Sequence, residues 1–316
     1  MTVERMTMTE GAMAERGVRE IARELELAAA PEPRSFLDMA IATLKRDRLT
    51  IIAASVLLLF CVVSATASWT SRAIGQDPYD IDVLNNFDPP SREHWLGTDD
   101  LGRDQVARLI YGGRVSLLIG VLGAAINLSI GVALGSLAGY FGKTLDDLVM
   151  WLITTLNSIP TIFLLLIVAA LFTFPWWGLA ILIGLLSWTG VARQVRGKFF
   201  SLKEQDFVTA ARSVGVSTPR IISLHILPNI WPLVFIIMGA DIGNLILVES
   251  ALSYLGLGVQ APTSTWGNML TKSQSFFSRG PWLPIAPGLA ITITVLCLYL
   301  VADGLRDALD PRLKEG

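Results

Sequence analysis

Six long apolar stretches alternate with polar segments along the chain. A helix rises 1.5 Å per residue, so an apolar run of about 20 residues crosses the ~30 Å hydrocarbon core of a bilayer. The pattern therefore predicts an all-α membrane protein with about six transmembrane helices. The predicted spans are 49–69, 116–140, 148–172, 177–195, 230–255 and 284–302.

The chain before the first span divides into two parts. Residues 1–34 are charged and alanine-rich and end in prolines, which predicts a cytoplasmic tail without fixed structure. Residues 35–48 place apolar side chains on one helical face and close with basic residues, which predicts an amphipathic helix on the membrane surface. An ordinary linker is the alternative for this part. Residues 49–69 are the first membrane anchor.

The remaining chain holds one long loop, a five-span core and a tail. Residues 70–113 are too long for a simple connection, and we expect them on the extracytoplasmic side. Apolar residues at helical spacing near their end predict a short amphipathic helix along the outer face. Residues 114–303 carry the other five spans, and residues 304–316 form a charged cytoplasmic tail.

Within the core, glycine and proline predict how the spans pack. The second span has small residues at four-residue spacing, which allow helices to approach closely in lipid. These are Gly120, Gly123, Gly131, Gly135 and Gly139. Pro160 lies in the third span and predicts a bend there, because proline cannot donate the helical hydrogen bond.

Composition supports the membrane class. Of 316 residues, 52% are hydrophobic and 16% are charged, whereas soluble domains carry about 25% charged residues. Cys61 and Cys297 lie in apolar runs, and His94 and His225 stand alone, so we expect no metal site. No basic stripe with interleaved aromatic residues is present, so nucleic acid is not an expected partner, whereas membrane lipid is.

Basic residues indicate the orientation of the spans. They are concentrated before the first span, between the fourth and fifth spans, and after the last span. Because lysine and arginine favour cytoplasmic loops, both termini are predicted to be cytoplasmic. Four arginines in the 70–113 loop depart from this rule.

The polar segment 197–229 separates the fourth and fifth spans and carries an ordered pattern of its own. Gly215 stands where a first short helix would end, and Pro219 stands at the first position of a second. Ala210 and Ala211 would give the first helix a flat surface that permits close approach. We predict two helices that dock on another protein, with a simple loop as the alternative.

The stretch "FVTAARSVGVSTPRIISLHILPN" resembles the cytoplasmic signature of ABC-importer membrane subunits. In that signature Glu-Ala-Ala is followed by three residues, Gly, nine residues and Ile-x-Leu-Pro. Thr209 stands at the glutamate position and His225 at the isoleucine position. The resemblance implies that an ATPase contacts this segment through Thr209, Ala210, Ala211, Gly215, Pro219, His225, Leu227 and Pro228.

Further stretches resemble the second-type (C-like) subunit of dipeptide, oligopeptide and nickel permeases. They are "HWLGTDDLGRD", "RLIYGGRVSLLIG", "ESALSYLGLGVQAPTSTWGNML" and "DGLRDALDPRLK". The resemblance covers about residue 35 to the end. It implies a MetI-like type I importer fold with cytoplasmic coupling helices, in the bacterial inner membrane. It also implies four kinds of partner: a homologous permease subunit, two ATPase subunits, an extracytoplasmic binding protein, and a peptide substrate or, alternatively, a nickel complex.

The chain itself is not expected to hydrolyse ATP. "GYFGKT" ends like a phosphate-binding loop, but Leu137 occupies the position of its first glycine and no strand is predicted before it. We therefore expect no catalytic residue and no bound cofactor in this chain, with ATP and Mg used by the partner ATPase subunits.

Two further groups of residues are candidates for contact with substrate or partner. Asp241, Asn244 and Glu249 lie in the fifth span, where ionisable groups line a path or gate, or join helices. Both interpretations remain open. Trp266, Phe276 and Phe277 lie in the last outer loop and either anchor it at the interface or contact the binding protein. A secondary transporter is the other alternative, but it would show broken helices with polar midplane sites in both halves.

Overall fold

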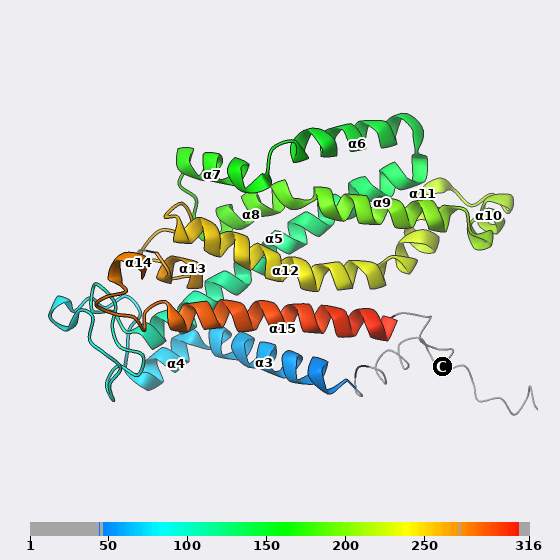
Figure 1. Ribbon diagram of the computed structural model, residues 1–316. Coiled ribbons are helices and arrows are strands. Elements are labelled where there is room, and N and C mark those ends of the chain that lie inside the picture. Colours follow the sequence, from blue (N-terminus) through cyan, green and yellow to red (C-terminus); the bar gives the residue numbers. More distant parts are fainter. Residues whose placement is uncertain (1–43, 45–46, 272, 310–316) are drawn as a thin grey trace, which may run out of the picture. The chain divides into compact units, whose positions relative to one another are not determined.

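The computed structural model describes residues 44, 47–271 and 273–309, which belong to one compact unit (Figure 1). These residues form helices joined by loops, with an isolated β-bridge between Thr98 and Asp104. The predicted tail 1–34, almost all of the predicted surface helix 35–48, and residues 310–316 lie outside the described residues.

The predicted count of about six spans is confirmed. Four helices are long and apolar enough to cross a membrane: α3 (Arg48–Ala65), α5 (Gln105–Phe141), α12 (Trp231–Tyr254) and α15 (Ile285–Leu309). Two further spans are each made of a bent pair, which gives six spans when each pair is counted once. The pairs are α6 (Lys143–Asn157) with α7 (Thr161–Leu171), and α8 (Trp176–Ser187) with α9 (Thr189–Lys203).

The two bends have different causes. The α6–α7 pair bends by 70° just before Pro160, where the proline ring disfavours helical geometry in the preceding residue. This bend was predicted. The α8–α9 pair bends by 45° at Trp188, where no proline is present. There the hydroxyl of Ser187 donates to the carbonyl of Ile183 at 2.8 Å, a contact that commonly bends helices.

Helix α5 packs against α9, α8, α12 and α3 (Figure 1). Its predicted close approach is confirmed on the α9 side. A β-carbon placed at Gly135 would lie 2.6 Å from the carbonyl oxygen of Ala192. One placed at Gly139 would lie 2.5 Å from the Cβ atom of Phe199. Side chains at these positions would therefore separate the two helices.

The start of α5 differs from the prediction. A separate short helix was expected along the outer face, but α5 runs without a break for 37 residues from Gln105. Asp104 caps it by accepting a hydrogen bond from the backbone N–H of Ala107 at 2.8 Å. Gly112 and Gly113 do not break the helix, because they pack directly against residues 265–266.

The shorter elements gather at the two ends of the spans. At one end lie α4 (Ala67–Ile74), η1 (Val83–Asn85), α13 (Trp266–Met269) and α14 (Ser273–Phe276). At the other end lie α10 (Asp206–Ser213), α11 (Thr218–Arg220), the π-helical turn η2 (Ile221–Ile226) and η3 (Leu227–Asn229) (Figure 1). We call this second group the α10–η3 segment, residues 206–229.

Candidate functional site

The α10–η3 segment has the two-helix form that its glycine and proline predict. Gly215 has a φ of +80°, a left-handed conformation that glycine adopts without steric cost. The N–H of Val216 donates to the carbonyl of Ala211 at 3.0 Å, which closes α10. Pro219 lies in the first turn of α11. The predicted helix end and helix start are both confirmed.

The inner side of this segment is joined to three spans. Val208 and Ile226 are buried in one hydrophobic cluster with Phe199 of α9 and Val234 of α12. The guanidinium of Arg212 lies 5.5 Å from the ring centroid of Tyr140 at the end of α5. Apolar contacts therefore hold the segment to the ends of these helices.

The outer side of the segment exposes a small apolar surface that the sequence reading missed. Val214 is 80% exposed and Leu224 63% exposed, and Phe207 and Ala210 are also exposed. The expected flat pair of alanines is wrong, because Ala211 is buried. Successive residues point about 100° apart around a helix, so neighbours rarely share one face.

The other predicted docking residues are divided between the surface and the interior. Thr209, Pro219 and Pro228 are exposed, whereas His225 and Leu227 are half-buried. The outer side of the segment therefore presents polar, apolar and small side chains together.

The three predicted polar residues of helix α12 contact different side chains. Asn127 of α5 donates a hydrogen bond to Asp241. The Tyr299 hydroxyl of α15 donates to Asn244 at 3.0 Å. Glu249 is 0% exposed and accepts a hydrogen bond from Ser253 at 2.7 Å. The contacts of Asp241 and Asn244 favour the interpretation of polar contacts that join helices. The Glu249 contact with Ser253 lies within α12, and the Glu249 side chain is in the interior.

The three candidate aromatic residues in the loop after α12 differ in how far they are exposed. Trp266 is only 2% exposed, and its ring N–H donates to the carbonyl of Leu109 at 2.9 Å. Its side chain therefore packs inside the protein and is not presented to a partner, which corrects the expectation for this residue. Phe276 is half-buried against Phe87 at 5.1 Å between ring centroids. Phe277 is 60% exposed and remains a candidate contact.

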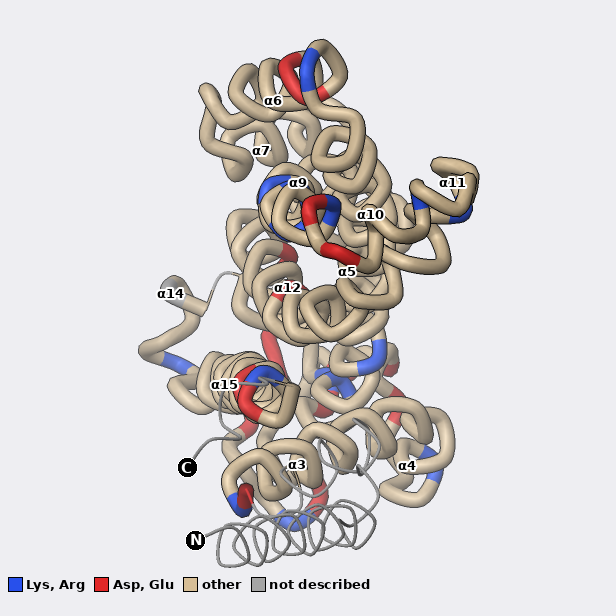
Figure 2. The backbone as a smooth tube through the Cα atoms, turned by 90° about the vertical axis from the view of Figure 1, so that its right-hand side faces the viewer, with Lys and Arg blue, Asp and Glu red and all other residues tan. Residues whose placement is uncertain are grey.

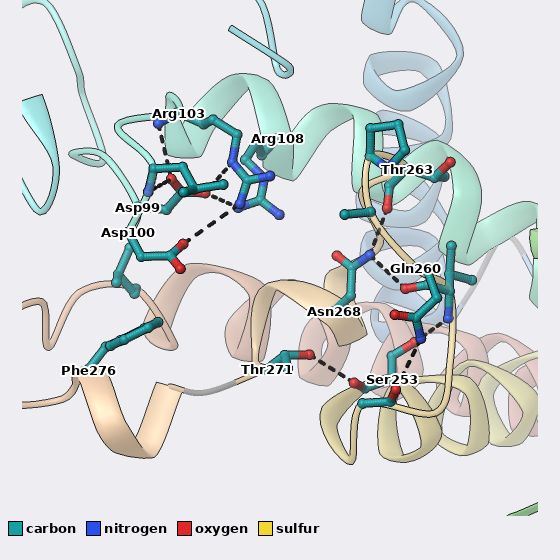
Figure 3. Close-up of a pocket in the computed structure, with 16 residues that line it drawn as sticks. Asp99, Asp100, Arg103, Arg108, Ser253, Gln260, Thr263, Asn268, Thr271 and Phe276 are labelled. Atoms are coloured by element: carbon teal, nitrogen blue, oxygen red, sulfur yellow. Dashed lines mark hydrogen bonds and ion pairs between the residues drawn. The ribbon is translucent and has the colours of Figure 1, made fainter. Parts of the chain in front are cut away.

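A cavity of about 300 Å³ lies at the end of the spans that carries α13 and α14, between the start of α5 and the loop that follows α12 (Figure 3). Asp99 accepts hydrogen bonds from Arg108 and from Arg103, the latter at 2.7 Å. Across the cavity, the Asn268 amide donates to the carbonyl of Thr263 at 2.7 Å. Arg108 of α5 also donates to the Ser264 hydroxyl at 3.3 Å, so this one side chain ties both the Asp99 loop and the loop after α12 to α5.

The two broken spans are joined by polar contacts that the sequence reading did not identify. The Thr189 hydroxyl donates to the side-chain carbonyl of Asn157 at 3.1 Å, so the two breaks lie side by side. Nearer the α10–η3 segment, Arg196 of α9 pairs with Asp146 of α6 through two hydrogen bonds. Within the described residues, no cluster of three or more His, Cys, Asp or Glu side chains is placed to hold a metal ion.

Comparisons with known proteins agree with this architecture. Residues 131–315 match the family described as "Binding-protein-dependent transport system inner membrane component". The oligopeptide transport system permease protein OppC of Haemophilus influenzae is 38% identical over 83% of this chain and 84% of its own length. The dipeptide permease protein DppC of Alkalihalophilus pseudofirmus is 36% identical over 86% of this chain and 88% of its own. The glutathione permease protein GsiD of Escherichia coli is 38% identical over 85% of this chain and 88% of its own length. The chain therefore belongs to the family of inner membrane components of binding-protein-dependent transport systems.

Proposed function

We propose that this chain is one permease subunit of an ATP-driven importer of peptides. Relatives that match it over more than four fifths of its length are named as oligopeptide, dipeptide and glutathione permeases. In this proposal the chain pairs with a homologous permease subunit to form the translocation path. Two ATPase subunits supply energy, and an extracytoplasmic binding protein delivers the peptide.

The proposed orientation places the α10–η3 segment and both termini in the cytoplasm of a bacterial cell. Figure 2 looks onto the end that carries α10 and α11, and basic positions are visible there on α9, α11 and α15. Basic residues are retained on the cytoplasmic side during insertion. This distribution supports the proposed topology.

ATP and Mg would be bound by the separate ATPase subunits. Lys143 begins α6 directly after Gly142, which caps α5. The "GKT" sequence thus runs from the cap of one helix into the first turn of the next, whereas a phosphate-binding loop joins a strand to a helix. This arrangement supports ATP hydrolysis in trans.

One observation carries the mechanism: the α10–η3 segment exposes the apolar side chains of Phe207, Val214 and Leu224 among polar ones, and its buried side is joined to α5, α9 and α12. An ATPase that binds the exposed side and closes on ATP would displace the segment. The attached helices would move with it as rigid bodies and open the path to one side or the other.

We expect Val214→Asp to lower ATP-driven peptide uptake by about tenfold or more while the subunit still inserts and assembles. A charge in a desolvated apolar contact costs well over the ~1.4 kcal/mol that corresponds to a tenfold change. Uptake and ATPase activity would be measured on the assembled transporter in proteoliposomes. Ser201→Asp is the matched control, because Ser201 is exposed on α9 outside the segment. Equal, normal uptake by both variants would contradict the proposed contact.

A further inference from the structure

The break between α6 and α7 exposes backbone within a span. Residues 157–160 are all exposed, residues 158–160 lie outside regular helix, and the helices on either side diverge by 70°. Figure 1 shows this break partway along the α6–α7 pair, beside the α8–α9 pair. Irregular backbone at membrane depth is tolerated only where protein buries it or where it lines a water-filled cavity.

The side chains at this break are polar as well. Thr154, Thr155, Asn157 and Ser158 are exposed, and we call these four residues the α6 polar stripe. Thr154 and Ser158 bond to carbonyls of their own chain, at 2.8 and 2.9 Å, which makes hydroxyls tolerable in lipid. These two hydroxyls alone would therefore not require water.

Asn157 cannot be accounted for in that way. Its side-chain oxygen accepts the hydrogen bond from Thr189. No group in the part of the chain that the structure describes accepts a hydrogen bond from its amide nitrogen. An amide left unpaired in hydrocarbon costs several kcal/mol. The exposed side of Asn157 must therefore meet water or a polar group.

The next helix shows what a lipid-facing surface of this protein looks like. The exposed large side chains of α7 include Phe163, Ile167 and Leu171, and all are apolar. Helix α6 also exposes Trp151 and Leu152 one turn before the α6 polar stripe, so the stripe is a polar patch between two apolar surfaces. Four of the five residues 154–158 are polar. Packing against another helix would not require this, whereas lining a water-filled path would.

The α6 polar stripe is also linked to the segment that we propose the ATPase moves. Asn157 is tied to Thr189 at the start of α9, and Asp146 of α6 is tied to Arg196 further along α9. Helix α9 in turn packs against the α10–η3 segment. A displacement of that segment would therefore reach the stripe through two polar contacts.

Resting on the proposed function, we propose that the α6 polar stripe lines the translocation path and hydrogen-bonds the main chain of the peptide in transit. Asparagine offers both donors and acceptors, and threonine and serine hydroxyls do the same. These groups match the N–H and C=O groups that every peptide carries, whatever its side chains. Contact with main-chain groups would admit peptides of different sequence.

Cysteine labelling of the assembled transporter in membranes tests this inference. With Cys61 and Cys297 replaced by alanine, Thr155→Cys and Ser158→Cys would be treated with a charged, water-soluble methanethiosulfonate. Only the thiolate reacts, and it forms in water but not in lipid. Thr292→Cys is the matched control, because Thr292 is exposed on α15 and its hydroxyl bonds to the carbonyl of Gly288 in its own helix.

We expect both stripe cysteines to react at least tenfold faster than the α15 control, and saturating peptide to slow their reaction. Stripe cysteines that react no faster than the control would contradict the inference, because the stripe would then face lipid or a packed partner helix. If the stripe cysteines react fast but saturating peptide does not slow their reaction, the inference is contradicted too. A wild-type assembly that takes up no peptide would overturn the proposed function instead, and uptake is measured separately from labelling.

Discussion

Gly135→Leu is expected to prevent α5 from packing on α9 and to leave little folded subunit in the membrane. A β-carbon at this position would lie 2.6 Å from the carbonyl oxygen of Ala192 and 2.9 Å from the Cβ atom of Val195. The first of these neighbours is backbone and cannot rotate away. Overpacking commonly costs about 1–3 kcal/mol even where side chains can move, and here two helices would have to separate.

The measurement is the yield and the thermal unfolding midpoint of the purified subunit. Gly197→Leu is the matched control, since a β-carbon at Gly197 of α9 meets nothing within 4 Å. The control should retain the wild-type unfolding midpoint. A Gly135→Leu subunit as stable as the control would show that α5 and α9 do not approach each other as described.

Glu249→Ala is expected to destabilise the contact between α12, α5 and the outer loop by about 2–5 kcal/mol. The Ser253 hydroxyl donates to one carboxylate oxygen at 2.7 Å and accepts the N–H of Val259 at 3.2 Å. The Ser116 hydroxyl lies 3.5 Å from the other oxygen and accepts the N–H of Trp266 at 3.1 Å. Alanine would leave both hydroxyls without an acceptor and would also leave a cavity.

Glu249→Gln separates the loss of an acceptor from the loss of volume. Glutamine has nearly the same shape, but its amide nitrogen donates where a carboxylate oxygen accepts. One serine hydroxyl would lose its acceptor, so we expect a loss of about 1–3 kcal/mol in the free energy of unfolding. Thermal or denaturant unfolding in detergent is expected to show the wild type as the most stable protein, the Gln variant as less stable and the Ala variant as the least stable. An alanine variant as stable as the wild type would contradict the described network.

The spans and their breaks could be predicted where the physics is local. Apolar length predicts the membrane helices, because the bilayer fixes how far each must reach. Pro160 and Gly215 predict a bend and a helix end, because each restricts or permits particular backbone conformations. These features depend on few neighbours in sequence, and the structure confirms them.

Other features depend on which helix lies opposite, and a single sequence does not contain that information. Ala210 and Ala211 look equivalent in sequence, yet only Ala211 faces the hydrophobic cluster. Trp266 resembles an interfacial anchor but is buried against α5. The bend at Trp188 has no proline near it. The contact between Asn157 and Thr189 joins residues 32 positions apart.

The central claim is that the exposed side of the α10–η3 segment binds an ATPase subunit in the cytoplasm. Cross-linking tests it most directly, with a single cysteine at Val214 in the assembled transporter and Cys61 and Cys297 replaced. We predict a cross-link from Val214→Cys to the ATPase subunit that blocks peptide uptake, and none from Ser201→Cys on α9. The absence of any such cross-link, or labelling of Val214→Cys by a membrane-impermeant reagent added outside intact cells, would contradict the account.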